Sequence, residues 1–195
     1  FEEKMDMDLF DYLFDDETDF IIKETDDEKT VKQKLNHLLP IIQQIIHGVK
    51  ELHDFGFAHM DIKLENILYN KSTGLIKLCD YAYATSLCLI KDFRGTKDYI
   101  APEIFLDDFY DPKKADMYSL GVLIFEMITD CHIYPHRKMD ACKTKKDWYN
   151  LKSQEIIFPG INFPPSLKEL VLNLTKVNPE ERITIEECIQ ELKNI

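Results

Sequence analysis

The segment YSLGVLIFEMIT, at residues 118–129, is apolar on nearly every face that a helix would present, and it constrains the fold more than any other part of the chain. A helix with no polar face is unstable at a surface, because its apolar side chains would stay in water. The other segments therefore have to cover it. We predict a folded domain with this helix at its centre, and 195 residues are enough to build a core around it.

An amphipathic helix is predicted from about residue 36 to residue 53. Five apolar residues recur there at helical spacing: Leu38, Ile42, Ile45, Val49 and Leu52. Pro40 fits such a helix only near its first turns, because proline has no backbone N–H to donate. The pattern indicates that one face of this helix lies in the core and the other in solvent.

Short strands and one long loop follow this helix. The strands ILY, residues 67–69, and LIKLC, residues 75–79, flank the turn NKSTG, which predicts a β-hairpin. Residues 80–103 show no regular period and are predicted to form a loop of a length that usually carries function. Three helix starts are predicted from capping residues: Asp8 for a short helix over residues 8–14, Ser166 with Glu169, and Thr184 with Glu187.

The negative charge is concentrated at the start of the chain. The formal net charge is −12, and residues 1–30 hold 13 acidic against 3 basic side chains, which leaves −2 for the rest. Acidic stretches at 15–20 and 24–30 are predicted to form a solvated connector. Five basic residues are predicted to form a surface loop: Arg137, Lys138, Lys143, Lys145 and Lys146. The acidity argues against nucleic acid as a partner, because phosphates would be repelled, and it permits basic peptide partners.

Cysteine usage indicates the compartment. Five cysteines, an odd number without the spacing of a disulfide framework, indicate reduced thiols in a cytoplasmic or nuclear protein.

Four potential metal ligands share one loop: Cys131, His132, His136 and Cys142. Their spacing fits no standard zinc pattern, which favours an ordinary loop. No apolar run approaches the length of a membrane span, the first residues are not signal-like, and Phe1 in place of methionine predicts that something upstream is left out.

The segment HMDIKLEN, residues 59–66, carries the residue types that phosphoryl transfer to an alcohol requires. The reaction needs a carboxylate near the hydroxyl, a cation near the transferred group and oxygen ligands for Mg²⁺. Asp61, Lys63 and Asn66 supply these types, and the hairpin returns Asp80 towards Asn66, so that two hard oxygen ligands suit Mg²⁺. The alternative is a polar turn whose Asp and Asn merely satisfy backbone groups.

The chain resembles the protein kinase family, which carries H-R-D-L-x-x-x-N, D-F-G and A-P-E in that order. The corresponding residues occur here in the same order: His59-Met60-Asp61 with Asn66, Asp80-Tyr81-Ala82, Ala101-Pro102-Glu103, Asp116 to Gly121, and Arg182. The resemblance covers essentially residues 1–195 and implies a mainly α fold, the kinase-like α+β fold with a helical C-terminal lobe and a small β-hairpin. It makes residues 59–66 the catalytic loop and 80–103 the activation segment, and it pairs Arg182 with Glu103.

The resemblance also implies a role for each site residue. Asp61 accepts or orients the hydroxyl proton, Lys63 neutralises charge on the phosphoryl group, and Asn66 and Asp80 hold Mg²⁺ with ATP. Lys63 is typical of Ser/Thr kinases. So is Thr96, which in that class contacts the catalytic Asp and Lys; the alternative is an ordinary loop hydroxyl.

Two residues depart from the family pattern. Met60 replaces an Arg that usually binds a phosphate on the activation segment, so such a phosphate loses a bidentate partner. Ala82 replaces a Gly, and its Cβ penalises backbone angles that Gly adopts freely by roughly 1 kcal/mol or more. We therefore expect Ala82 to restrict the loop or misplace Asp80.

Matched without a gap to the family, Phe1 falls at the gatekeeper and residues 1–7 at the hinge. This match assigns five residues to the cleft. Glu2 and Lys4 would present backbone groups to adenine, and Leu68 would pack beneath the adenine ring or in the hairpin core. Asp8 would contact the ribose or a basic substrate residue, and Glu65 would lie near the peptide. Asp8 could equally be a helix cap. The sequence has no G-x-G-x-x-G and no V-A-I-K-like lysine, so we expect that the N-terminal kinase lobe is missing and that this chain alone is inactive.

The leading hypothesis is a Ser/Thr protein kinase that transfers the γ-phosphoryl group of ATP to hydroxyls of basic protein substrates. A pseudokinase that serves as a scaffold or regulatory binding module is the alternative; Met60 and Ala82 favour it, and the complete set of four site residues disfavours it. A small-molecule kinase of related fold is a third interpretation. Thr96, Arg182 and the A-P-E segment argue against it, because in the family they build a surface for extended peptides.

Overall fold

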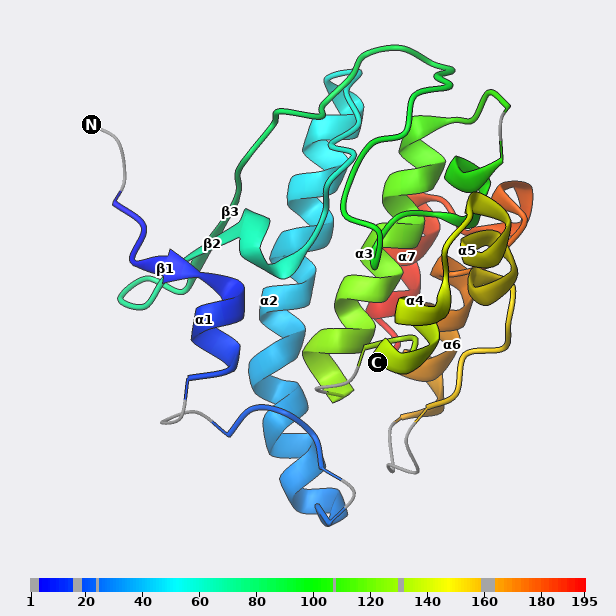
Figure 1. Cartoon of the computed structure of the whole chain (residues 1–195). Helices are drawn as coiled ribbons and strands as arrows, with labels where there is room; N and C mark the ends of the chain where they lie inside the picture. The colour runs from blue at the N-terminus through cyan, green and yellow to red at the C-terminus, as the bar shows by residue number, and fades with distance from the viewer. Residues whose placement is uncertain (1–3, 16–18, 24, 107, 130–131, 159–163) are drawn as a thin grey trace.

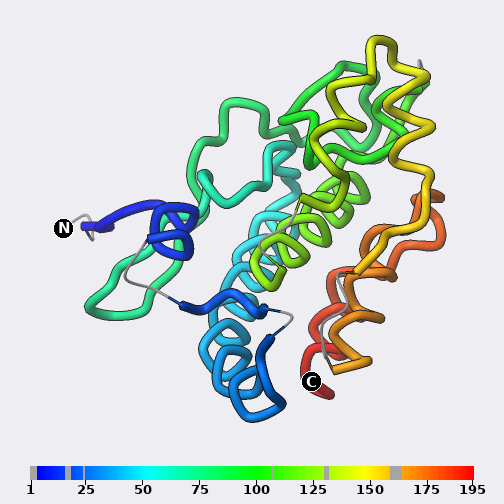
Figure 2. The backbone as a smooth tube through the Cα atoms, turned by 60° about the horizontal axis from the view of Figure 1, so that its bottom comes forward, coloured from blue at the N-terminus to red at the C-terminus, as the bar shows by residue number. Residues whose placement is uncertain are grey.

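Helix α3, Pro112–Thr129, lies at the centre of the molecule and is buried along almost its whole length. The structure is a computed structural model, and it describes residues 4–15, 19–23, 25–106, 108–129, 132–158 and 164–195. Helices α2, Glu28–Asp54, and α6, Pro165–Leu174, pack against α3, while α7, Ile185–Leu192, contacts α2 and α6. Figures 1 and 2 both show α2 and α3 between the sheet on one side and α4 to α6 on the other. The predicted central helix is confirmed.

The remaining elements are short. They are β1 Met7–Asp8, α1 Leu9–Leu13, η1 Leu64–Asn66, β2 Ile67–Asn70, β3 Leu75–Leu78, η2 Pro102–Phe105, α4 His136–Ala141, α5 Lys145–Lys152 and η3 Pro179–Glu181, where η marks a 3₁₀ helix. The described part of the chain is therefore mainly helical, as predicted.

The predicted β-hairpin is confirmed and gains a third strand. Strands β2 and β3 pair antiparallel, with Ile67 opposite Leu78 and Asn70 opposite Leu75. Strand β1 pairs with the other edge of β2, with Asp8 opposite Leu68. Sequence periodicity does not reveal β1, because two residues are too few to show an alternating pattern.

Helix α2 is longer than predicted, and Pro40 lies well inside it rather than near its first turns. Asp27 caps the helix by accepting a hydrogen bond from Thr30 N at 2.8 Å, so residues 28–30 are helical instead of part of a connector. Pro40 is exposed on the solvent side. The buried face of α2 packs against α3 and β3, and this packing outweighs the cost of a proline, about 3 kcal/mol.

Two predictions about helix starts have different outcomes. The capping box of Thr184 and Glu187 is confirmed, since Glu187 N donates to Thr184 Oγ1 at 3.2 Å and Thr184 N to Glu187 Oε2 at 2.7 Å. The prediction for Ser166 is wrong. Helix α6 begins at Pro165 after Pro164, with no side-chain cap, because proline presets the first helical backbone angle one residue earlier.

The predicted basic surface loop is also wrong in most of its length. Arg137 and Lys138 lie on α4, Lys145 and Lys146 lie on α5, and Lys143 lies between the two helices. Lysine and arginine are good helix formers, so charge alone does not distinguish a loop from two short surface helices.

Candidate active site

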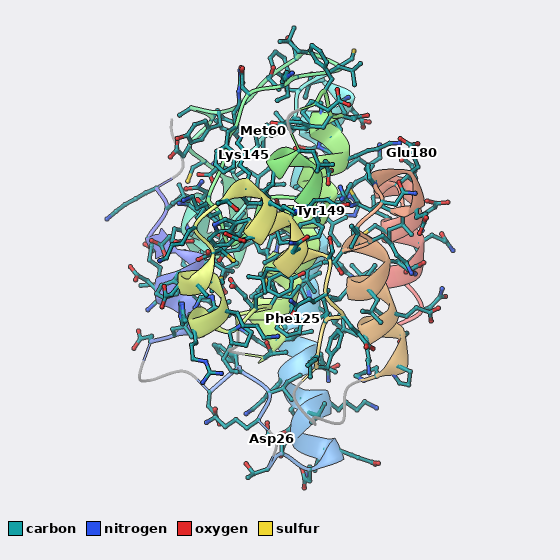
Figure 3. All side chains as sticks on the ribbon, turned by 45° about the vertical axis from the view of Figure 1, so that its right-hand side comes forward. Asp26, Met60, Phe125, Lys145, Tyr149 and Glu180 are labelled. Carbon is teal, nitrogen blue, oxygen red and sulfur yellow. The ribbon has the colours of Figure 1, made fainter. Side chains whose placement is uncertain are left out.

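A single buried carboxylate on α3, that of Asp116, holds the start of loop 59–66. Asp116 is 1% exposed; its Oδ2 accepts hydrogen bonds from His59 N at 2.7 Å and from His53 Nε2 at 2.9 Å, and its Oδ1 accepts from Met60 N at 2.8 Å. Met60 is held in the left-handed backbone region with φ 68°. Figure 3 labels Met60 beside the N-terminal end of α3. A side chain of the central helix therefore fixes the backbone at the bend of the loop.

The imidazole of His59 links this loop to the end of the hairpin. Its Nε2 lies 3.0 Å from the Cys79 carbonyl oxygen, and its Nδ1 lies 3.3 Å from Asp61 N. A carbonyl can only accept and a backbone N–H can only donate, so the ring carries its hydrogen on Nε2 and accepts on Nδ1. His59 thus connects Asp61 with the residue before Asp80.

The Asp61 carboxylate is held on both of its oxygens. Oδ1 accepts hydrogen bonds from Thr96 N and from Thr96 Oγ1, both at 2.8 Å. Oδ2 accepts from Asn66 Nδ2 at 3.0 Å and lies 3.7 Å from the ammonium group of Lys63. The predicted contact of Thr96 with Asp61 is confirmed. Among the described residues, Thr96 makes no direct hydrogen bond to Lys63.

Asn66 uses its amide nitrogen to hold Asp61 and keeps its oxygen for other partners. Nδ2 also donates to the Asp61 carbonyl oxygen at 2.8 Å. No described residue donates to Asn66 Oδ1, and no buried side-chain oxygen in the described part of the chain lacks a partner. The Asn66 oxygen therefore lies at the solvent-accessible edge, although the residue is only 5% exposed.

Asp80 stands at the same edge but is much more open. It follows β3, is exposed, and has a left-handed backbone with φ 58°. Cys79 N donates to the Asn66 carbonyl oxygen at 2.9 Å, so the hairpin brings the backbone before Asp80 directly beside Asn66. Asp61 and Asn66 are thus joined directly, and Asp80 is joined to them through Cys79. Left-handed residues other than glycine are uncommon and gather at functional sites.

The expected strain at Ala82 is not found. Ala82 is not among the described residues with positive φ, and its N–H donates to Asp80 Oδ1 at 3.3 Å. The left-handed residue is Asp80 itself, and Asp tolerates this conformation better than most side chains. In this conformation the Cβ at position 82 therefore carries no penalty, and the restriction of the loop by Ala82 stays a prediction.

Segment 80–103 is anchored at its far end by a buried ion pair. Arg182 donates to both carboxylate oxygens of Glu103, at 2.5 and 2.6 Å, and also to three backbone carbonyl oxygens: those of Lys114, Lys176 and Val177. Its guanidinium lies 5.1 Å from the ring centroid of Tyr118. The predicted pair of Arg182 and Glu103 is confirmed, and its two parallel hydrogen bonds are the geometry that only Arg supplies.

An acid-lined cavity of about 320 Å³ opens beside this loop. The acidic cavity, as we call it, is lined by three carboxylates, Glu65, Asp98 and Glu126, with Thr96 and Phe10 also on its wall. Tyr99 donates a hydrogen bond to Glu126, and the His132 ring lies 2.9 Å from Glu126. Burial raises the pKa of the Tyr99 hydroxyl, and the negative charge of Glu126 raises it further, so Tyr99 stays a donor. Sequence reasoning missed Glu126, because no motif surrounds it in its apolar helix.

The residues assigned to the hinge side of the cleft have other contacts. Glu2 lies outside the described residues. The Lys4 carbonyl oxygen accepts a hydrogen bond from Asn70 Nδ2 at 2.8 Å. Asp8 caps α1 by accepting from Asp11 N at 2.8 Å, Leu68 is half-buried in β2, and Glu65 is exposed on η1. The alternative role of Asp8 as a cap is therefore confirmed.

The loop with four potential metal ligands gives no support to a metal site. Cys131 lies outside the described residues, and His132 is bonded to Glu126 and packs edge-on against His136. Within the described ranges, no three His, Cys, Asp or Glu side chains are grouped as metal ligands. None of the helices in the described part of the chain has the length and apolar character needed to cross a bilayer.

Comparison with known proteins defines the class. The family model of the protein kinase domain matches residues 3–192. A rice protein named serine/threonine-protein kinase SAPK9 (Oryza sativa subsp. japonica) is 34% identical over 151 residues, which are 74% of this chain and 41% of the relative. Serine/threonine-protein kinase SRK2C of Arabidopsis thaliana is 35% identical over 149 residues, 74% of this chain and 43% of the relative.

A third relative, serine/threonine-protein kinase SRK2D of Arabidopsis thaliana, is 34% identical over 163 residues, 78% of this chain and 44% of the relative. This chain belongs to the protein kinase family, and the resemblance inferred from its motifs is confirmed. The chain spans less than half the length of these three curated relatives.

Proposed function

We propose that the protein transfers the γ-phosphoryl group of ATP to serine or threonine hydroxyls of proteins. The observation that carries this proposal is the geometry of Asp61, whose carboxylate is oriented by Thr96 on one oxygen and by Asn66 on the other. A carboxylate that is fixed in this way can accept or orient the proton of an incoming hydroxyl. The names of the matched relatives support serine and threonine as acceptors.

Each of the other site residues has a role in the proposal. Lys63 lies next to Asp61 and neutralises charge on the transferred group. The Asn66 oxygen and the exposed Asp80 carboxylate are hard oxygen donors of the kind that Mg²⁺ takes together with nucleotide phosphates. Bound Mg²⁺ would supply charge neutralisation at the phosphates. The Lys4 N–H and Leu68 would face the adenine, by analogy with the family.

The acidic cavity supports a basic substrate. Glu65, Asp98 and Glu126 line this cavity together with the Thr96 that contacts Asp61. Arg or Lys near the acceptor hydroxyl would gain charge-assisted hydrogen bonds there. A reducing compartment, cytoplasmic or nuclear, is proposed as well. It is supported by the free thiols of the four described cysteines, Cys79, Cys88, Cys142 and Cys188.

The test is the Asp61→Asn variant of the full-length protein. A general base contributes about 10² to 10⁴ in rate, so we expect the turnover of a serine-containing basic peptide to fall by at least that factor. The control is Asp54→Asn, the same chemical change at an exposed carboxylate paired with Lys50, and it should keep wild-type turnover. Equal turnover by Asp61→Asn and wild type would refute the assignment.

Three further arms test the substrate class, the scaffold alternative and the metal ligand. Peptides with Arg near the serine should be phosphorylated faster than matched peptides with Glu there, and the Glu65→Gln variant should reduce this preference. If the wild-type protein transfers no phosphate to any peptide with ATP and Mg²⁺, the scaffold alternative replaces the enzyme.

Asp80→Asn should raise the Mg²⁺ concentration required for half-maximal rate, because it removes one charged oxygen ligand.

A further inference from the structure

Lys152, the last residue of α5, is a buried cation that the proposed reaction does not use. The residue is 1% exposed. Its Nζ donates a hydrogen bond to the Asp98 carbonyl oxygen at 3.0 Å. Three aromatic rings surround the ammonium group, with centroids 5.4 Å away for Tyr118, 5.5 Å for Tyr134 and 6.0 Å for Trp148. Within the described ranges, no carboxylate forms an ion pair with it.

A charge in this position is costly for the fold. A buried ammonium group without a carboxylate partner loses its hydration, and one carbonyl and three rings compensate only part of the loss. Burial accordingly lowers the pKa of Lys152 to about 7, against the opposing effects of Asp98, Glu126 and Cys142. A methionine of similar length would fill the same space without this cost. Stability alone therefore does not account for a lysine here.

The hydrogen bond of Lys152 reaches the turn that touches Asp61. In the turn 96–100, Tyr99 N and Ile100 N both donate to the Thr96 carbonyl oxygen, at 3.0 and 3.1 Å. Thr96, at the start of the turn, is bound to the Asp61 carboxylate, and Asp98, in its middle, is bound by Lys152. The turn is thus held by Asp61 through Thr96 and by α5 through Lys152, and α3 holds it as well, because Ser119 Oγ donates to the Tyr99 carbonyl oxygen at 3.0 Å and the Tyr99 hydroxyl donates to Glu126.

Helix α5 has its own attachment to the body of the molecule. Trp148 stacks on Phe105 of η2 with an interplanar angle of 4° and a centroid distance of 5.6 Å, and Tyr134 donates to the Lys152 carbonyl oxygen at 3.0 Å. Neither contact uses the Lys152 side chain. Figure 3 labels Lys145 and Tyr149 on this helix. Removal of the ammonium group would therefore free the Asp98 carbonyl and loosen the middle of the turn, while α5 stays in place.

We infer that Lys152 is a positioning residue: through the Asp98 carbonyl it fixes the turn 96–100, and so keeps Thr96 on Asp61 and Asp98 at the acidic cavity. The inference rests on the proposed function, because the turn matters only if Asp61 acts on a peptide hydroxyl. Small displacements of a positioned group are expensive in catalysis, and a shift of about 1 Å can cost on the order of 100-fold in rate. The substrate affected is the basic peptide rather than ATP.

The experiment compares Lys152→Met with Lys168→Met in the full-length protein. Both variants remove one lysine, but Lys168 is exposed on α6, with its ammonium near the Phe158 ring. For Lys152→Met we expect kcat/KM for a basic peptide to fall by at least about 10-fold. The KM for ATP should stay the same, and the thermal midpoint should not fall. The control variant should match wild type in all three measurements.

Two readouts separate positioning from a merely structural role. In wild type, kcat/KM for the peptide should change across pH 6 to 8 with a step that Lys152→Met lacks, because the Lys152 pKa, lowered to about 7, falls in that range. The charged or titratable groups that act on Lys152 are Asp98, Glu126 and Cys142, and all three stay in the variant. Hydrogen exchange at the Tyr99 and Ile100 amides should quicken in Lys152→Met, while exchange in α3 stays the same.

The outcomes are distinguishable. Wild-type kcat/KM in Lys152→Met would overturn the inference, as would an activity loss that merely follows a lowered thermal midpoint with an unchanged pH profile. If wild-type protein has no transferase activity, the proposed function fails. In that case hydrogen exchange still decides whether Lys152 holds the turn. Unchanged exchange at the Tyr99 and Ile100 amides of Lys152→Met would overturn this structural part of the inference.

Discussion

Asp116 and Lys152 are two buried charges that hold two neighbouring loops of the site, and they do so in opposite ways. Asp116 lies in α3 and accepts hydrogen bonds from the backbone N–H groups of His59 and Met60 and from His53. Lys152 lies in α5 and donates to one backbone carbonyl, that of Asp98. Both therefore fix backbone in the loops they hold, which makes the geometry of each loop depend on a residue far away in the sequence.

The difference between them lies in how fully each charge is compensated. Three donors surround the Asp116 carboxylate, whereas the Lys152 ammonium has one oxygen and three ring faces. A well-compensated buried charge is a permanent part of the structure, and a poorly compensated one gives up its proton near neutral pH. We therefore expect loop 59–66 to be held more firmly than the turn 96–100.

The largest expected effect is the loss of Asp116. Asp116→Ala leaves the N–H groups of His59 and Met60 buried without an acceptor, so we expect a loss of about 3–5 kcal/mol in unfolding free energy. Urea unfolding of the full-length protein measures this loss of free energy, and turnover should be lost as well.

The control is Asp111→Ala. It removes a half-buried carboxylate that caps the same helix by accepting from Lys113 N, and it should cost about 1 kcal/mol. Similar losses in the two variants would contradict the special role of Asp116.

Gly95→Ala tests the point where the two loops touch. Gly95 has φ +93°, and a Cβ there would lie 2.5 Å from the Met60 carbonyl oxygen and 2.7 Å from Ile100. The left-handed conformation and the overlap together should cost about 2–4 kcal/mol and displace Thr96 from Asp61. Gly56 is the matched control, because it also has positive φ, +87°, but a Cβ added there would have nothing within 4 Å.

For Gly56→Ala we expect a loss of only about 1 kcal/mol, from the backbone conformation alone. Denaturant unfolding gives both values, and peptide turnover should fall in the Gly95 variant only. Equal losses at the two glycines would mean that the two loops are not packed tightly against each other at this point.

The pH dependence of stability separates the two buried charges. Burial lowers the pKa of Lys152 from 10.5 to about 7, so between these two pH values the unfolded chain holds a proton that the folded chain lacks. The contribution of Lys152 to stability therefore rises with pH across that window, by at most about 1.4 kcal/mol per pH unit, and is constant below it. We expect Lys152→Met to be most stabilising, relative to wild type, at or below pH 7.

That advantage should shrink as the pH approaches 10, since wild-type Lys152 is then neutral in the folded protein. Thermal or urea unfolding of both proteins at several pH values measures the difference, and other titrating groups cancel because both proteins contain them. A difference that does not change with pH would show that Lys152 titrates normally.

The sequence predicts those parts of the site that local spacing encodes. Loop 59–66, the hairpin and the pair of Glu103 with Arg182 all follow from motifs and their order. Asp116 stands out only as a member of a motif, although an acid in a largely apolar helix is a signal in itself. Lys152 carries no signal, because a lysine at the end of a short surface helix is expected to be exposed until tertiary contacts cover it.

The wrong predictions have physical reasons of the same kind. The position predicted for Pro40, near the start of its helix, follows from propensity alone and leaves out the packing of α2 on α3. The strain predicted at Ala82 is a family inference about backbone angles, which no sequence pattern can fix, and the chain places the left-handed residue at Asp80 instead. Backbone conformation at a loop is set by its anchors, and those anchors are distant in sequence.

Ala82→Gly should have the smallest effect, because neither buried charge holds this part of segment 80–103. Ala82 is exposed and has no left-handed backbone to relieve, so a glycine gains nothing in the folded state and adds freedom to the unfolded one. We expect a loss of about 0.5–1 kcal/mol in unfolding free energy and no gain in turnover. Ala84→Gly, a nearby change that lacks the hydrogen bond to Asp80, is the control and should give a similar loss of stability. A several-fold rise in turnover for Ala82→Gly alone would mean that the Cβ at this position does restrain Asp80, and that the site has a further anchor beside Asp116 and Lys152.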